Sequence, residues 1–459
     1  MERAKKTLCH KYEVVLERPI IVEIFPRQQD FAIRTFGMPG GAGFLGVCFG
    51  QVITANSPSS QGANPANWEA VLWHEFCHVV TLAKTNNRMP RWLSEGISVY
   101  EELQANPAWG QTMTPAYRHL ILGGALTPVS KLSAAFLRPQ SAQHLQFAYY
   151  ESALVVEYLV EKHSLEKIKE VLVDLGSGDQ INEVLQLHFG SLDELDQGFA
   201  EFARQRAETL APEVDWQEPD LSPAAPIELI SKWVKENPRN VAGLRLLASK
   251  LIAEKNWEAA KQPLERLIEL YPDDISPNNA LLLLARIHRE LGSATSEQQV
   301  LERLAQLDSD AVEVYLRLSA LAAEAGDWAK VISKAEQILA VNPLIKPPYE
   351  YLAEAAREIG DTSRSIAAYQ ALLQLDPFDL ADAHYRLSMQ LHQAKRFSEA
   401  KRHVLMALEV APRYRQAHQL LSELARHERV QKEMTVKESE RQPPAKSISD
   451  VRPAEEASP

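Results

Sequence analysis

The second half of the chain repeats about every 34 residues, and this period constrains its fold more than any other feature. Prolines recur there in steps of 34, 71, 34 and 35 residues, at Pro238, Pro272, Pro343, Pro377 and Pro412, and Ser309 stands in the middle of the double step. Glycines at 292, 326 and 360 keep the same 34-residue step. Two helices joined by a small-residue turn fill one such repeat, so the pattern predicts an all-α solenoid.

A small residue recurs in the first helix of each repeat, where two paired helices must approach each other closely. Large apolar residues come just before it, as at Leu244–Leu247 and Leu281–Leu284. The small residues are Ala248, Ala285, Ser319, Ala353 and Ser388. This arrangement resembles the tetratricopeptide repeat, and the resemblance implies about five full repeats between 241 and 412. A half repeat at 227–238 would precede them, and a capping helix at 415–428 would follow.

The first 210 residues have a different pattern. The segments KYEVVLE and RPIIVEIF are rich in Val and Ile and predict strands, and a glycine-rich turn then leads to one or two more strands before residue 60. A helix is expected to start near Asn64, as its N-cap, and to run to about residue 84. Further helices are expected at about 92–104, 115–123, 146–162, 164–175, 180–188 and 191–209.

Composition marks two further boundaries. Residues 211–226 contain four prolines and are acidic, which predicts a linker. Residues 429–459 are charged and proline-rich with few apolar side chains, which predicts disorder. We therefore expect an α+β domain at 1–210, a linker at 211–226, an all-α solenoid at 227–428 and a disordered tail at 429–459.

Charge, hydropathy and cysteine content argue against several classes of protein. The 49 Lys and Arg against 61 Asp and Glu give a net charge of −12, which argues against a nucleic-acid partner. No apolar run reaches the ~18 residues of a transmembrane segment, and three cysteines cannot build a disulfide framework. The N-terminus has no apolar stretch after its positive charges, so it does not read as a signal peptide. A cytoplasmic location is the default expectation, and an exported protein is expected if the natural start lies before Met1.

The segment HEFCH at 74–78 carries the sharpest chemical signal. His74 and His78 are four residues apart on a predicted helix, so both imidazoles project from one face and can hold a single Zn²⁺. Glu75 follows the first of them, from where it can act as a general base toward a water molecule without binding the metal. The same spacing also arises by chance, so the motif requires a matching context.

That context is the segment RWLSEGISVYEE at 91–102. It resembles the W-L-x-E-G-x-x-x-Y pattern of the aminopeptidase N group of gluzincin metallopeptidases at Trp92, Leu93, Glu95, Gly96 and Tyr100. The resemblance implies a zincin-like α+β fold over about residues 12–210, one Zn²⁺ per chain and Glu95 as its third protein ligand. Sixteen residues separate His78 from Glu95, two fewer than in that group. The chain therefore looks closest to the bacterial peptidase MA-like proteins, which are often fused to tetratricopeptide repeats.

The resemblance also implies a tyrosine on a later helix that donates a hydrogen bond to the oxyanion formed during hydrolysis. The segment AYYESALVVEYLVE offers Tyr149 or Tyr150. Counting back from Tyr158–Leu159 favours Tyr149, whereas the position directly before Glu151 favours Tyr150. We favour Tyr149, and the remaining alternative is that both residues only pack the helix.

The resemblance further implies a substrate that pairs with an edge strand while its carbonyl faces the metal. The segment from Gly43 to Gly50 is the candidate for this strand, because its glycines permit close approach of another backbone. The aminopeptidases also carry a G-x-M-E-N sequence that binds the substrate amine, and FGMPGGAGF lacks its glutamate. Exopeptidase activity is therefore not carried over, and the choice between endopeptidase and exopeptidase stays open.

The other polar residues near these motifs are expected to be structural. Cys77 points about 100° away from the second histidine and is expected to be a core thiol or to lie behind the metal ligands. Thr81 and Ser98 could hydrogen-bond the metal ligands, but surface or helix-face roles are favoured for them, and Glu101 and Glu102 are expected on a solvated face. The other histidines lack a partner at metal-ligand spacing and are expected to be ordinary, among them His119, His144, His163 and His188.

These features together predict a zinc-dependent peptidase. His74, His78 and Glu95 would bind the zinc, Glu75 would be the general base and Tyr149 would stabilise the oxyanion. Its substrate would be a peptide or protein, and the repeats would bind a protein partner or an extended part of the substrate. One alternative is a catalytically inert metallopeptidase-like scaffold whose repeats mediate protein–protein interaction. Another is a structural zinc site in a hydrolase of a non-peptide amide or ester.

Overall fold

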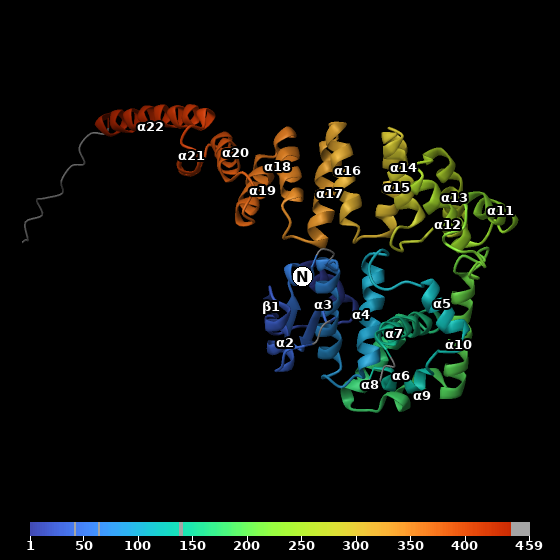
Figure 1. Cartoon of the computed structure of the whole chain (residues 1–459). Coiled ribbons are helices and arrows are strands. Elements are labelled where there is room, and N and C mark those ends of the chain that lie inside the picture. Colours follow the sequence, from blue (N-terminus) through green and yellow to red (C-terminus); the bar gives the residue numbers. More distant parts are fainter. Residues whose placement is uncertain (41–42, 63–64, 137–140, 442–459) are drawn as a thin grey trace, which may run out of the picture. The chain divides into compact units, whose positions relative to one another are not determined.

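The structure is a computed structural model that describes residues 1–40, 43–62, 65–136 and 141–441. The part before residue 210 combines a small sheet with many helices (Figure 1). Its first elements are α1 (Glu2–Lys11), β1 (Ile21–Phe25), α2 (Gln28–Phe36), β2 (Gly46–Phe49), β3 (Val52–Asn56) and the 3-10 helix η1 (Pro58–Ser60). The predicted combination of a small sheet with helices is confirmed.

The three strands form one sheet in the order β1-β3-β2. β1 runs parallel to β3, and β2 runs antiparallel to it, with Gly46 opposite Ala55. A two-residue turn connects β2 to β3, and Gly50 takes a positive φ of 68° in this turn. Among the described strands, β2 is therefore an antiparallel edge strand, and it lies within the segment from Gly43 that the sequence singled out.

Two helices near the N-terminus were not predicted, and the second of them, α2, lies within the segment 12–60 that was predicted to be rich in strands. α1 is amphipathic, because Ala4 and Leu8 are one turn apart and both buried against the core. α2 buries Phe31 in the same way. Residues 12–17, predicted as a strand, form none, and Val15 is 87% exposed. A β-branched run forms a strand only beside a partner, and none of the described strands pairs with this segment.

The HEFCH motif lies in α3 (Trp68–Lys84). Asn67 caps this helix, since its side-chain oxygen accepts a hydrogen bond from the backbone amide of Ala70 at 3.1 Å. The helix therefore begins at Trp68. The predicted N-cap, Asn64, lies outside the described residues.

α3 is held between the sheet and the helical core. On one side, Val79 packs with Ile53 and Ala55 of β3. On the other side, Phe76 and Val80 pack into the core that the helices of this domain share. Both sides are fixed by burial, so the face that carries the two motif histidines has a fixed orientation.

α4 (Arg91–Ala105) and α7 (Ala142–Lys162) approach each other unusually closely. A Cβ atom at Gly96 of α4 would lie 2.5 Å from the carbonyl oxygen of Ser152 in α7 and 3.1 Å from Val156. A contact as short as 2.5 Å is sterically forbidden, so only glycine permits this approach. The glycine that follows Glu95 thereby sets the distance between the two helices.

The remaining helices before residue 210 pack around α7 and contribute to one core with it. They are α5 (Pro115–Leu122), η2 (Val129–Lys131), α6 (Leu132–Ala135), α8 (Leu165–Ser177), α9 (Ile181–Phe189) and α10 (Leu192–Thr209). The helices predicted from residue 92 onward agree with the observed ones to within about four residues. None of the helices in the described residues is both long and apolar enough to span a membrane.

Residues 211–226, predicted as a linker, form an irregular segment that is anchored to the first repeat. The side-chain amide of Asn240 donates hydrogen bonds to Asp215 at 2.9 Å and to the carbonyl of Gln217 at 2.8 Å. The ring of Trp216 contacts the ring of Tyr271 edge-on. These contacts fix the path of the chain into the solenoid.

Helix pairs then follow one another as the repeat period predicted. They begin with α11 (Ile227–Glu236), α12 (Val241–Ala253), α13 (Trp257–Leu270), α14 (Ala280–Glu290), α15 (Ala294–Leu307), α16 (Val312–Glu324) and α17 (Trp328–Val341). Ala248, Ala285 and Ser319 are at most 1% exposed, as expected where paired helices approach each other. Gly292 and Gly326 take positive φ angles in the turns within their repeats. The predicted helical repeats are confirmed.

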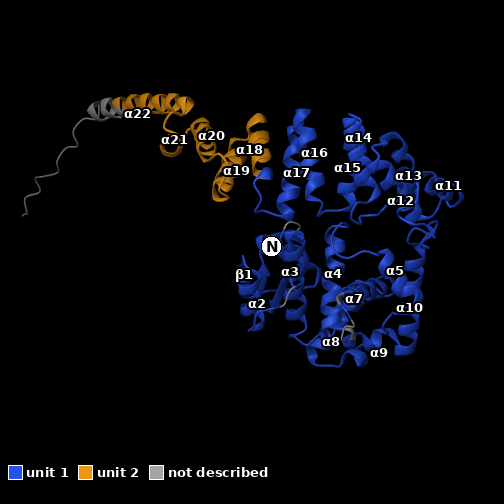
Figure 2. Cartoon of the chain, in the orientation of Figure 1, with its two compact units in different colours: residues 1–348 blue, residues 349–459 orange. Residues whose placement is uncertain are grey.

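Contacts divide the chain into two compact units, residues 1–348 and 349–459 (Figure 2). The repeats continue with α18 (Pro347–Glu358), α19 (Thr362–Gln374), α20 (Leu380–Gln393), α21 (Phe397–Val410) and α22 (Arg415–Arg441). α22 extends past residue 428, so the first part of the segment predicted to be disordered is helical. Its Lys, Glu and Gln residues are good helix formers even without an apolar face. Residues 442–459 lie outside the described residues.

Candidate active site

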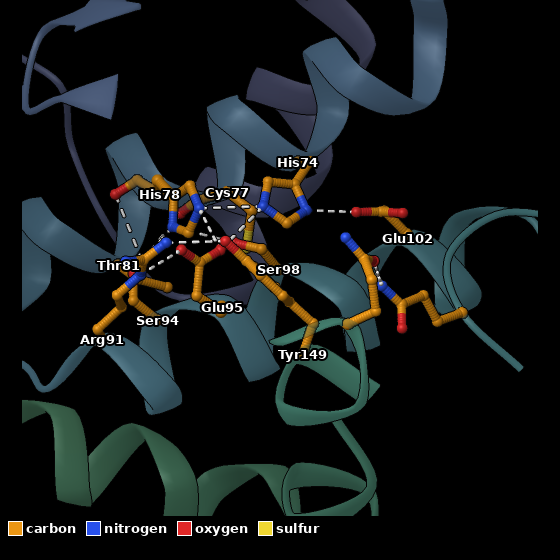
Figure 3. Close-up of polar contacts among 12 residues, drawn as sticks. His74, Cys77, His78, Thr81, Arg91, Ser94, Glu95, Ser98, Glu102 and Tyr149 are labelled. Atoms are coloured by element: carbon orange, nitrogen blue, oxygen red, sulfur yellow. Dashed lines mark hydrogen bonds and ion pairs between the residues drawn. The ribbon is translucent and has the colours of Figure 1, made fainter. Parts of the chain in front are cut away.

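α3 and α4 bring together the three side chains predicted to bind a metal (Figure 3). His74 and His78 project from one face of α3, and Glu95 points at them from α4. The two Nε2 atoms lie 3.1 Å apart, and each lies 3.3 Å from Oε2 of Glu95. Within the described part of the chain, this is the one group of three His, Cys, Asp or Glu side chains close enough to share a metal ion.

The second nitrogen of each imidazole is hydrogen-bonded on the opposite side of the ring. Nδ1 of His74 contacts the carboxylate of Glu102 (Figure 3). Nδ1 of His78 lies 2.8 Å from the hydroxyl of Ser94 and 3.2 Å from that of Ser98. These contacts fix the orientation of both rings and leave both Nε2 atoms facing the carboxylate on α4. Metal-binding histidines are held in the same way in other proteins.

The prediction that Glu101 and Glu102 form a solvated face is wrong. Glu101 is 1% exposed, accepts a hydrogen bond from the Tyr12 hydroxyl at 2.7 Å and pairs with Lys11. Glu102 is 9% exposed and contacts the first motif histidine. The end of α1, a helix that the sequence did not predict, covers this side of α4. Ser98, expected on a helix face, is fully buried, and its hydroxyl contacts His78 of α3.

The separations of the three donors fit a zinc ion. A tetrahedral site with metal–ligand distances of about 2.05 Å places its ligand atoms about 3.3 Å apart, and the three separations here are 3.1, 3.3 and 3.3 Å. Two imidazoles and one carboxylate are also a donor set of catalytic zinc, in which the fourth position stays open to water. The residues present therefore match zinc in number, kind and spacing.

Glu75 lies between the histidine face of α3 and the edge strand β2. A Cβ atom at Gly46 of β2 would lie 2.6 Å from Oε1 of Glu75, so glycine at this position leaves the room that the carboxylate needs. Glu75 is 4% exposed, and its Oε2 has no hydrogen-bond partner among the described residues. Burial raises the pKa of this carboxyl group. An unpaired carboxylate oxygen with a raised pKa is suited to accept a proton.

The structure places Tyr149 in the site and Tyr150 outside it. The Tyr149 hydroxyl accepts a hydrogen bond from Arg91 at 2.8 Å, and Arg91 also donates to Glu95 at 3.3 Å. Burial, helped by the charge of Glu95, raises the pKa of Tyr149 to about 12, so the phenol is protonated at neutral pH. Tyr150 is 5% exposed and stacks on Tyr117, with 4.6 Å between ring centroids.

These side chains line one cavity of about 780 Å³. The segment that contains β2 contributes Gly43 to Cys48, α3 and α4 contribute the donors and Glu75, and α7 contributes Tyr149. The loop after α4 adds residues 108–111, and the loop between α15 and α16 adds Asp310. A volume of this size is typical of sites that bind a drug-sized ligand or a short peptide.

Two other polar residues of α3 have structural contacts. Cys77 is fully buried, as expected, and burial raises the pKa of its thiol well above the usual value. Thr81 is fully buried and donates a hydrogen bond to the carbonyl of Cys77 at 3.1 Å. Among the histidines expected to be ordinary, His188 pairs with Asp174 at 2.6 Å.

The cavity residues that were not predicted to have a role include Arg91, Ser94, Glu102 and Asp310. Helical spacing could have found three of them. Arg91 lies one turn before Glu95 and Glu102 two turns after it, on the same face of α4, and Ser94 lies one turn before Ser98. Asp310 had no such signal, because its position in the cavity depends on the packing of the solenoid against the first domain.

Models of three protein families match parts of the chain. The model of the Peptidase MA superfamily matches residues 7–203. The model of a tetratricopeptide repeat matches residues 246–274, and that of the bacterial transcriptional activator domain matches residues 287–377, which cover α15 to α19. The chain thus combines a segment similar to the Peptidase MA superfamily with a later segment similar to a tetratricopeptide repeat. A comparison with curated proteins finds no match.

Solved structures of repeat proteins are also similar to part of the chain. MamA 41-end from Desulfovibrio magneticus RS-1 is 17% identical over 38% of this chain and 96% of its own, with a TM-score of 0.30. YrrB, described as a TPR protein with an unusual peptide-binding site, is 13% identical over 42% of this chain and 98% of its own, with a TM-score of 0.34. A thermophilic TPR protein from Thermus thermophilus is 20% identical over 39% of this chain and 95% of its own, with a TM-score of 0.25.

Proposed function

We propose that residues 1–210 form a zinc-dependent peptidase domain and that the repeats bind substrate or a protein partner. The observation that carries this proposal is the convergence, in one cavity, of three donors spaced for zinc, a buried carboxylate and a tyrosine hydroxyl. The match of residues 7–203 to the Peptidase MA superfamily supports it. Peptides are the proposed substrates because an edge strand borders the same cavity.

In this proposal, His74, His78 and Glu95 hold a zinc ion, which when bound supplies an activated water and polarises the substrate carbonyl. Glu75 accepts a proton from the attacking water at Oε2, the oxygen without a partner, and passes it to the amine leaving group. Tyr149 donates a hydrogen bond to the carbonyl oxygen as negative charge develops there.

Arg91 is proposed to orient the Tyr149 hydroxyl. A phenol oxygen that accepts a hydrogen bond from a guanidinium keeps its own proton available for a second partner. The same guanidinium donates to Glu95, so one side chain ties the tyrosine of α7 to the carboxylate of α4. This tie holds the hydroxyl at a fixed place relative to the three donors.

The substrate is proposed to add itself to β2 as a further strand. An edge strand has backbone N–H and C=O groups that no neighbour uses, and an extended peptide can pair with them. Gly46 is the residue of β2 that contacts Glu75, so a carbonyl paired near it lies beside the general base.

Zinc content tests the ligand assignment. We expect the purified full chain to bind about one zinc ion, and His78→Ala and Glu95→Ala to lose it. Glu75→Gln should keep it, because Glu75 handles only the proton. Full zinc occupancy of Glu95→Ala at limiting free metal would show that the third ligand is misassigned.

Hydrolysis of an unstructured protein, such as denatured casein, tests the activity. We expect Glu75→Gln to abolish cleavage while zinc and fold persist. Tyr149→Phe should lower kcat about a hundredfold to a thousandfold with little change in KM, the size of one lost oxyanion donor. Tyr150→Phe is the matched control and should change kcat much less.

Two outcomes would support the alternatives instead. If the zinc-loaded wild type cleaves no peptide of a broad panel and Glu75→Gln binds the same partners as wild type, the domain is an inert scaffold. If it cleaves esters or non-peptide amides but no peptide, the hydrolase acts on another class of substrate.

A further inference from the structure

The repeat domain contributes a residue to the cavity that holds the candidate catalytic residues. Asp310 lies in the loop between α15 and α16 and lines the same cavity as His74, Glu75 and Glu95. Its neighbour Ser309 donates a hydrogen bond to the carbonyl of Ala108, in the loop after α4, at 3.0 Å. Ser309 is 8% exposed, so this contact is shielded from water. All of these residues belong to the same compact unit, 1–348.

Local hydrogen bonds hold this loop in one conformation. The Asp308 carboxylate accepts from the backbone amide of Asp310 at 2.9 Å, and the hydroxyl of Ser309 lies 3.0 Å from Oδ1 of Asp310. Tyr315 of α16 donates its hydroxyl hydrogen to the carbonyl of Ala305 at 3.0 Å and so fixes the base of the loop. The Asp310 side chain is therefore presented to the cavity by an ordered loop.

Asp310 also contacts the helix that carries the histidines. Hydrogen bonds from the side chain and the backbone amide of Asn67, the N-cap of α3, reach its carboxylate. Asn67 is 4% exposed, whereas Asp310 itself is exposed. One side of the carboxylate is thus bound to the wall of the cavity, and the other side remains open to a ligand.

The charges of the cavity leave a place for a cation beside Asp310. Glu75, Glu95 and Glu102 all lie at the metal cluster, and the guanidinium of Arg91 is hydrogen-bonded to Glu95 and Tyr149. The partners of Asp310 are neutral groups, and no cation pairs with it among the described residues. A carboxylate on an open wall that has no cationic partner attracts a positively charged ligand group, and the neighbouring Asp308 adds to the negative charge there.

We propose that Asp310 selects substrates that carry an ammonium or guanidinium group near the scissile bond. The repeat domain would then take part in substrate selection inside the cavity as well as in binding outside it. Two sources can supply the cation: the side chain of a Lys or Arg, or the free amino terminus of the peptide. This inference rests on the proposed peptidase function.

The test compares matched peptides on the zinc-loaded full chain. One series carries Arg or its neutral isostere citrulline at successive positions around the cleavage site, and a second series has a free or an acetylated amino terminus. We expect Asp310→Asn to lower kcat/KM about fivefold to tenfold for the cationic member of one series and to leave the neutral member unchanged. The series that responds identifies the source of the cation.

Three controls separate charge recognition from damage to the fold. Asp310→Glu keeps the charge and should keep the preference. Glu313→Gln removes an exposed charge of α16 that lies outside the cavity lining, and it should change neither series. Thermal unfolding of each variant identifies a loss that is caused by instability.

Binding provides a readout that needs no turnover. In the Glu75→Gln background, the affinity for fluorescent forms of the same peptides should fall on adding Asp310→Asn, again only for the cationic member. Equal effects on cationic and neutral peptides, or no effect on either, would overturn the inference. Absence of cleavage by wild type with selective binding intact would instead overturn the peptidase proposal alone.

Discussion

Replacing Gly96 by Ala tests whether the close contact of α4 with α7 sets the geometry of the site. The new Cβ would lie 2.5 Å from the carbonyl oxygen of Ser152, which is backbone and cannot rotate away. An ordinary contact needs about 3.4 Å, so the helices must separate locally by roughly 0.9 Å. α4 carries Arg91 and Glu95 and α7 carries Tyr149, so this movement separates the tyrosine from the residues that orient it.

Two opposing terms decide the effect of this substitution on stability. Ala gains about 1 kcal/mol of helix propensity over Gly, whereas overpacking of a tight core contact costs about 1–3 kcal/mol. Because the contact partner is backbone, we take the upper part of that range and expect a net loss of about 1–2 kcal/mol. For a domain of about 200 residues, this lowers Tm by about 2–8 °C.

The effect on catalysis should exceed the effect on stability. A displacement of about 1 Å at the reacting groups can cost about a hundredfold in rate, so kcat should fall by that order below the unfolding temperature. Zinc content should stay near one per chain, because the three donors lie on α3 and α4, whereas the new contact separates α4 from α7. Gln104→Ala, at an exposed position of α4, is the control for propensity alone. A Gly96→Ala protein with unchanged Tm and kcat would refute the reasoning.

Two further substitutions test the charges around the site. Glu102→Gln removes the charged partner of His74 and should weaken zinc binding about tenfold, measured by competition with a chelator; Glu69→Gln, an exposed change on α3, should not weaken it. Glu151 is 1% exposed, and burial raises its pKa from 4.5 to about 7. Because the folded state then holds its proton more tightly than the unfolded state, the free energy of unfolding falls as the pH rises through this interval. Above pH 7 the ionised, buried Glu151 carboxylate lowers the free energy of unfolding by about 3 kcal/mol. Glu151→Gln should therefore raise the free energy of unfolding in urea at pH 8, and raise it much less at pH 4.5. An equal increase in the free energy of unfolding at both pH values would contradict the assignment of this pH dependence to Glu151.

Local periodicity made most of the fold predictable. The 34-residue step fixed the helix pairs because each repeat contacts mainly its neighbours, so sequence distance and spatial distance agree there. The same reasoning failed for residues 12–17, whose β-branched side chains predict a strand. Strand formation depends on a partner elsewhere in the chain, and propensity alone does not supply one.

The candidate site was predictable where its residues share a helix or a known motif. The four-residue step of His74 and His78 follows from helix geometry, and the position of Glu95 followed from the resemblance of its segment. The sequence favoured Tyr149 over Tyr150 but left both open, because adjacent residues on a helix point about 100° apart and packing decides which one faces the cavity. Tyr149 is the one that lines it. Burial of Glu101 was missed because it depends on Lys11 and Tyr12 at the end of α1, a helix that the sequence did not predict. Burial of Glu102 was missed because it depends on the packing of α4 against His74 of α3.

Asp310 shows where sequence reasoning reaches its limit. A sequence period of 3.6 residues indicates contacts within one helix, and a period of 34 residues indicates contacts between neighbouring repeats. Ser309 and Ala108, in contrast, are 201 residues apart in the sequence and are joined by one hydrogen bond. A boundary drawn at residues 211–226 treats the peptidase-like domain and the solenoid as independent parts, each with its own core. The cavity lining joins Asp310 of the solenoid to Glu75 and the three donors of the first domain, and residues 1–348 form one compact unit. The substrate selection that we propose for Asp310 therefore requires both parts of the chain.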